Sequence, residues 1–194
     1  MNKVGCILLS LLAVALVLGV GTAAAQDNVY DVGYFANAVA GAPLAHLRLT
    51  NDGDASTANL CANIYVFDNT EEMHECCSCL ITSNGYLDLT VNGNLLTNIL
   101  DHGVAPTRGI IKEVSSLVPS GGVCNPVSYT TQDGIKGWLT HAQREGGSYA
   151  LTETTLTDAS LSATELGFNL EETCGMLQSL GTGTGVCSCA DAGD

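Results

Sequence analysis

The chain has 194 residues and a formal net charge of −14, with only 6 Lys and Arg residues against 20 Asp and Glu residues. Nucleic acids and anionic membrane surfaces are bound through clustered cations, so this composition excludes both as partners. The length suits one domain with an adequate hydrophobic core.

The first 25 residues predict export. Lys3 precedes the apolar stretch "ILLSLLAVALVLGV", and small residues follow up to Ala25, which is the pattern of a cleaved leader. Cys6 lies within this leader and would be removed with it. No second long apolar run follows, so we expect no membrane span after cleavage. The expected location is outside the cell or on its surface, with the periplasm as the alternative.

Short runs with a period of two, separated by turn signals, predict strands along most of the remaining chain. In 86–91, apolar and polar residues alternate between two Asn-Gly pairs. The run 61–68 is apolar on both faces, which indicates a strand inside a sheet. Further strands are expected at 29–35, 44–50, 109–116, 137–143 and 148–156. This number of strands predicts an immunoglobulin-like antiparallel β-sandwich.

The segment "LSATELGFNLEETCGMLQSLG" predicts one amphipathic helix near the C-terminus. Ser162 and Glu165 have the spacing of a capping box. The expected organisation is a leader, an N-terminal extension or first strand, a β-sandwich, and a C-terminal helix with a cysteine-bearing tail. These divisions cover 1–25, 26–43, 44–160 and 161–194. One stripe of the helix carries Leu166, Leu170, Cys174 and Leu177.

An even number of cysteines remains after the leader, and in an exported chain this predicts disulfides. If 76–79 is extended, Cys76 and Cys77 point to opposite faces and need different partners. We expect Cys174 to pair with one of the two tail cysteines and the other tail cysteine to pair within the 76–79 cluster. The eight cysteines are Cys61, Cys76, Cys77, Cys79, Cys124, Cys174, Cys187 and Cys189.

The stretch "HECCSC" at 74–79 also raises the question of a metal or catalytic site. A zinc protease would need a second histidine where Ser78 stands. A tetrathiolate zinc site from the two Cys-x-Cys pairs leaves one residue within each pair, whereas the usual spacing leaves at least two. The stretch "NDGDAS", with Asp52 and Asp54, is more typical of a turn than of an irregular calcium site. We therefore predict no cofactor, no metal and no catalytic residues.

Several blocks of the chain carry a family resemblance. With "CANIYVFDNTEEMHECCSCLITSNGYLDLTVNGNLLTN", "GIIKEVSS" and "LSATELGFNLEETCGMLQSLGTGTGVCSC", most of 61–189 resembles a family of uncharacterised, exported, cysteine-rich bacterial proteins. The resemblance implies a shared secreted fold with structural cysteines and implies no catalytic activity. More loosely, the arrangement is similar to donor-strand fibre subunits, in which an extension of one sandwich completes the next.

The preferred functional hypothesis is a non-catalytic extracellular structural protein, a pilus-like fibre or surface-layer subunit. Its partners would be copies of itself, joined by β-strand addition. The alternative for the same N-terminal run is that it forms the first strand of its own sandwich. The residues of this self-assembly strand are Val29, Tyr30, Val32, Tyr34 and Phe35.

A second hypothesis is a secreted monomeric binding module for a glycan or a surface protein. Several exposed rings on one face, together with the absence of an empty sheet edge, would favour it. An enzyme is the least supported class. The contact residues of a binding module would be Tyr65, Tyr86, Tyr129, Tyr149 and Trp138.

Overall fold

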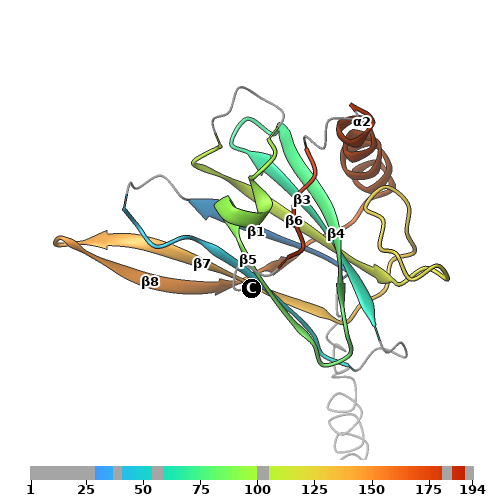
Figure 1. The fold of residues 1–194 in the computed structure, drawn as a ribbon, viewed down its shortest axis with the longest axis horizontal. Coiled ribbons are helices and arrows are strands. Elements are labelled where there is room, and N and C mark those ends of the chain that lie inside the picture. Colours follow the sequence, from blue (N-terminus) through green and yellow to red (C-terminus); the bar gives the residue numbers. More distant parts are fainter. Residues whose placement is uncertain (1–28, 37–40, 54–58, 100–104, 181–184, 191–194) are drawn as a thin grey trace, which may run out of the picture.

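The structure is a computed structural model that describes residues 29–36, 41–53, 59–99, 105–180 and 185–190. The leader expected at 1–25 and the residue Asp54 lie outside the described residues. Within them, nine β-strands form two antiparallel sheets, and one helix follows near the C-terminus (Figure 1).

Sheet A has the strand order β4-β3-β6-β1-β9, and every neighbouring pair is antiparallel. The strand β3 lies between β4 and β6 and is buried along all but its last residue, as its apolar sequence predicts. The strands are β1 (Tyr30–Ala36), β3 (Leu60–Asp68), β4 (Met73–Ile81), β6 (Arg108–Leu117) and β9 (Thr157–Asp158).

Sheet B has the strand order β5-β2-β7-β8. Along β2 the residues alternate between partly exposed and buried, which is the period of two expected for a half-buried strand. The β7–β8 hairpin reaches beyond the other strands, and α2 lies at the opposite end of the molecule (Figure 1). The strands are β2 (His46–Asn51), β5 (Tyr86–Thr90), β7 (Ile135–Glu145) and β8 (Ser148–Thr155).

The main core lies between the two sheets. Phe35, Ile64 and Ile111 of sheet A are fully buried in it, and Leu47 and Leu89 of sheet B pack in the same cluster. Burying one such side chain contributes about 1.5–3 kcal/mol to stability. The inward face of each sheet therefore provides the main hydrophobic stabilisation of the fold.

The predicted helix is present, but its first part is wider than an α-helix. A π-helical segment, η2 (Glu165–Glu172), leads into α2 (Thr173–Ser179). The Ser162 Oγ accepts a hydrogen bond from the Glu165 N–H at 3.0 Å, as the capping-box spacing predicts. Leu170, Cys174 and Leu177 are buried in a second cluster on the outer face of sheet A, whereas Leu166 is only partly buried.

The tail after the helix lies along the edge strand β4. The Cys76 N–H donates to the Gly185 carbonyl at 2.9 Å, and the Cys187 N–H donates to the Cys76 carbonyl at 3.3 Å. A short π-helical turn, η1 (Val91–Leu95), contacts the tail, because the Ser188 N–H donates to the Asn94 carbonyl at 2.9 Å. The tail thus covers part of the β4 edge.

The fold is therefore mainly β, with two antiparallel sheets and a short C-terminal helix, as predicted at this level. Each of the seven expected strands overlaps an observed one. The strand β4 was not predicted as a strand of its own, because its centre, "HECCSC", has few of the β-branched and aromatic residues typical of strands. Pairing with β3 holds this segment extended.

Candidate functional site

The cysteines of "HECCSC" are structural. All eight cysteines of the described residues form four disulfides, and three of these bridges involve β4. The sulfur atoms of Cys77, Cys79 and Cys189 lie within 4.8 Å of one another, but each is already bonded in a disulfide. The bridges are Cys61–Cys124, Cys76–Cys174, Cys77–Cys187 and Cys79–Cys189.

The pairing expected for Cys174 is wrong, because it bonds to Cys76 and not to the tail. The helix packs on the outer face of sheet A, where Cys76 belongs to the same buried cluster as Cys174. Cys77 and Cys79 point to the other face and belong to the core between the sheets, together with Cys187. The expectation that Cys76 and Cys77 point to opposite faces is therefore confirmed. Cys76 bonds to Cys174 of the helix, and Cys77 bonds to Cys187 of the tail.

The strand considered for self-assembly, β1, pairs within its own chain. Tyr30–Ala36 pairs in full register with β6, and Asp31 and Val32 also pair with β9. Phe35 is fully buried between the sheets, whereas Tyr30 is buried under the helix and Tyr34 is 58% exposed. The other two residues of the proposed strand, Val29 and Val32, pack against the cluster under the helix.

Two glycines allow β1 to fit between its neighbours β6 and β9, in the space that we call the slot. A Cβ at Gly33 would meet the side-chain ends of Leu156 at 2.4 Å and Leu139 at 2.5 Å, so any side chain here would displace these two leucines. A Cβ at Gly109 would meet the Phe67 carbonyl and the ring of Phe35. The Phe35 ring thus fills a space that exists because residue 109 has no side chain, and this contact fixes the register of β1.

Three carboxyl groups form a row across this slot. Asp31 of β1 lies directly opposite Glu113 of β6 on one side and Asp158 of β9 on the other. Burial, and then the hydrogen bond with the Asp158 carboxyl, raises the pKa of Asp31 to about 7, although Lys136 opposes this shift. Burial, together with the charge of Asp31, also raises the pKa of Glu113 well above its ordinary value. The Asp31 Oδ1 and Glu113 Oε1 atoms make no hydrogen bond.

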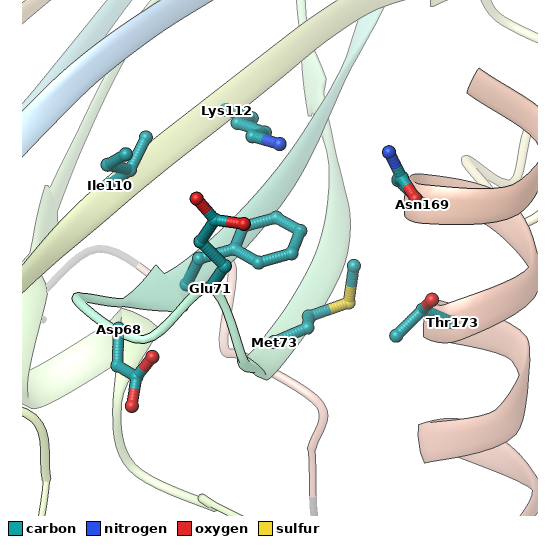
Figure 2. A pocket seen from close by; sticks show the side chains of 8 residues that line it. Asp68, Glu71, Met73, Ile110, Lys112, Asn169 and Thr173 are labelled. Carbon is teal, nitrogen blue, oxygen red and sulfur yellow. The ribbon is translucent and has the colours of Figure 1, made fainter. Parts of the chain in front are cut away.

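A pocket of about 220 Å³ lies between the β3–β4 turn and the helix (Figure 2). Lys112 is its central charged group, with Nζ 4.4 Å from the centroid of the Phe67 ring and 2.6 Å from Glu165 Oε1. Figure 2 shows Asn169 and Thr173 on the helix side of the pocket and Asp68 and Glu71 on the turn side. Because Lys112 is already paired with Glu165, the pocket has no free cation among its described lining residues.

The turn side of this pocket is rigidly hydrogen-bonded. Asp68 Oδ1 accepts from the backbone N–H groups of Thr70 at 2.7 Å and of Glu72 at 3.0 Å. Although burial alone would raise it, these bonds, one from the Thr70 hydroxyl and the contact with His74 lower the pKa of Asp68 to about 2. This turn was not predicted as a site; the spacing of Asp68, Glu72 and His74 is the feature of the sequence that could have indicated it.

The five aromatic residues considered for binding fall into two groups. Tyr65 is fully buried and hydrogen-bonded to Tyr129 at 2.8 Å, so both belong to the packing under the helix. Tyr86, Trp138 and Tyr149 occupy positions of one parity on sheet B, on the face that points away from the core. The structure therefore brings three of the five rings to one face.

A polar network crosses this outer face of sheet B. The Arg48 guanidinium contacts Asp88 at 3.2 Å and Glu153 at 2.5 Å, and it donates to the Thr140 hydroxyl at 2.7 Å. The Tyr86 hydroxyl donates to Asp88 Oδ2 at 2.9 Å. The four strands of sheet B are thereby joined by side chains as well as by their backbones.

Comparison with known proteins gives no neighbour: no family model matches the chain, and no curated protein or solved structure matches it significantly. Within the part of the chain that the structure describes, no helix is long and apolar enough to cross a membrane.

Proposed function

We propose that the protein is a non-catalytic extracellular structural subunit whose copies assemble by exchanging β1. In this proposal the two sheets form an immunoglobulin-like sandwich, and the β1 of one copy occupies the slot between β6 and β9 of the next. The observation that carries the proposal is that the first described strand lies inside sheet A and not at its edge.

The fit of β1 in its slot supports exchange. A strand that leaves this slot exposes the backbone of β6 and the apolar space around Phe35. An identical strand from a second copy makes the same backbone hydrogen bonds and the same side-chain contacts, so the exchange adds no new interface chemistry. Gly33 and Gly109 would set the same register in both cases.

The distribution of disulfides supports the same proposal. No cysteine lies in β1, and the four bridges join β3, β4, the helix, the tail and the loop that carries Cys124. These bridges constrain the rest of the chain when β1 is absent. They are also compatible with an oxidising location outside the cell.

Disulfide trapping between copies tests this proposal. Ala36 and Arg108 face each other across β1 and β6 and are both exposed. A tagged Ala36→Cys chain is mixed with an untagged Arg108→Cys chain under native conditions, oxidised, and separated on a non-reducing gel. Exchange of β1 predicts a cross-linked dimer that contains one chain of each kind.

A matched control uses Thr50→Cys and Tyr86→Cys, which face each other across β2 and β5 in sheet B. Because β2 and β5 are not proposed to exchange, this mixture should yield no mixed dimer. In the doubly substituted Thr50→Cys, Tyr86→Cys chain the link should form within the chain. A mixed dimer no more abundant for the β1 pair than for the sheet B pair would refute the proposal.

The outer face of sheet B favours a second candidate, a binding module for glycans or a surface protein. Tyr86 is 57% exposed on this face, and the polar network beside it offers donors and acceptors for hydroxyl groups. Trp138 is the single tryptophan of the chain, so its fluorescence reports directly on this face. A glycan that shifts this fluorescence in the wild type and not in a Tyr86→Ala variant would support binding; a screen without any shift would count against it.

A further inference from the structure

The β3–β4 turn gathers three groups of metal-binding type outside the proposed assembly slot. Asp68 ends β3, Glu72 lies in the turn, and His74 is the second residue of β4. One ligand atom from each of these residues lies within 4.8 Å of the other two. A backbone turn therefore places two carboxylates and one imidazole around a common point.

The His74 ring provides an independent reason to look for a ligand here. The residue is only 7% exposed, and its Nε2 atom makes no hydrogen bond. Nε2 lies 3.3 Å from Asp68 Oδ2, which is close enough for an ion pair with a protonated ring but lacks the alignment of a hydrogen bond. A buried polar atom without a hydrogen bond destabilises the fold, and a bound ion would remove this cost.

The second oxygen of Asp68 has room for such a ligand. Oδ1 is occupied by the backbone N–H groups of the turn, whereas Oδ2 accepts only from the Thr70 hydroxyl, at 2.9 Å, among the hydrogen bonds of the described residues. Oδ2 faces the His74 ring. The Glu72 side chain is exposed, so it can turn toward the same point at little cost.

We propose that Asp68, Glu72 and His74 bind a divalent transition-metal ion, with Zn²⁺ as the simplest case. Imidazole nitrogen together with carboxylate oxygen suits zinc and its neighbours in the first transition row, whereas calcium and magnesium prefer oxygen ligands alone. Three protein ligands leave a further position for water or an external group. Of the three residues, Asp68 alone also lines the pocket beside Lys112, so the ion would lie next to that pocket and not inside it.

Calorimetry with Zn²⁺ alone, on the disulfide-intact protein, tests the site. Wild type should bind one ion at this turn, and the His74→Gln variant should bind it at least tenfold more weakly. The Glu72→Gln variant should also lose affinity, and because Glu72 is exposed this variant keeps the test valid if the His74 variant does not fold. Titration with Co²⁺, followed by visible absorption, reports directly on the ligands.

The matched control is His46→Gln on sheet B. His46 is also beside a carboxylate, but its Nδ1 is 2.6 Å from Asp88 Oδ1 in an aligned hydrogen bond, so its ring already has a partner. Its substitution should leave Zn²⁺ affinity unchanged. The inference is overturned if wild type binds no ion, if neither turn variant weakens binding, or if the His46 variant weakens it equally.

Discussion

On the β4 side of sheet A, three disulfides join the strand to the helix and the tail, whereas on the β1 side hydrogen bonds and packing alone hold the strands. The two sides also differ in the chemistry of their interiors. Cys77 and Cys79 pack among apolar residues, but Asp31 faces two carboxyl groups. Covalent bonds thus hold the β4 side together, whereas the β1 side depends on noncovalent interactions, among them those of the Asp31 carboxyl group.

Removing a disulfide should have the largest effect. The Cys76→Ala, Cys174→Ala double variant removes a bridge between residues 98 positions apart. Because the Cys77–Cys187 bridge remains beside it, the loop that is opened has only about 15 residues, and the expected loss in the free energy of unfolding is about 3 kcal/mol. Urea denaturation followed by circular dichroism measures it. The bridge Cys61–Cys124, with a separation of 63, closes a loop that the other three bridges do not shorten and should contribute more, about 4.3 kcal/mol. A loss below about 1 kcal/mol would show that the helix does not need its covalent link.

Removing the buried Phe35 side chain, which anchors β1, should have the next largest effect on stability. Phe35→Ala removes a fully buried ring and should cost about 3–5 kcal/mol of unfolding free energy. It should also favour chains whose β1 is displaced, visible as faster proteolysis of the N-terminal strand. Tyr34→Ala, at a 58% exposed neighbour in the same strand, serves as the control and should cost much less. Equal effects of the two variants would contradict the role of Phe35 as anchor.

The pH should act on both sides of sheet A, through Asp31 of β1 and Glu75 of β4. Asp31 has a pKa of about 7 when folded and about 3.8 when unfolded, so folding favours its protonated form. The stability that this proton provides is complete below pH 4 and is lost as the pH rises to about 7. Burial also raises the pKa of Glu75 on β4 to about 7, so part of the pH dependence should remain in any Asp31 variant.

Asp31→Asn separates the two contributions. At pH 8 it should stabilise the protein by about 1 kcal/mol, a reduced share of the full linkage energy because water reaches the neighbouring Asp158 carboxyl. It should also flatten the stability profile between pH 4 and 7. Glu145→Gln, at an exposed position of β7, is the control and should leave the profile unchanged. A profile that Asp31→Asn does not alter would contradict the proposed row of carboxyl groups.

The smallest effect is expected in the polar network on sheet B. Arg48→Gln breaks the contacts with Asp88 and Glu153, but these groups are partly exposed, so the expected loss is at most about 1 kcal/mol. Thermal denaturation at low and high salt measures it, and the difference from wild type should shrink at high salt. A loss of several kcal/mol would contradict the view that this partly exposed network contributes little to stability.

Much of the fold could be predicted from the sequence because it depends on local patterns. The alternation at 86–91, the double-sided apolar run at 61–68 and the capping-box spacing of Ser162 and Glu165 each correspond to an observed element. The partner of Cys174 could not be predicted in this way. It depends on which face of sheet A the helix covers, and no local pattern specifies that choice.

The candidate sites were less accessible to sequence reasoning. Asp31, Glu113 and Asp158 come from three strands far apart in the chain, and only the register of sheet A makes them neighbours. The turn with Asp68, Glu72 and His74 is local, but its interest depends on the burial of His74. An unremarkable histidine in the sequence becomes notable only when its nitrogen is found without a hydrogen bond.

The disulfide partners of the adjacent residues Cys76 and Cys77 depend on the register of β4 against β3. A slip of β4 by one position against β3 would turn Cys76 toward the core and Cys77 toward the helix, and their bridges would then form with the wrong partners. Thiol exchange can undo such bonds while the chain is still folding. The mature bond pattern is therefore a lasting chemical record of strand alignment, and peptide mapping can recover it even from the unfolded protein.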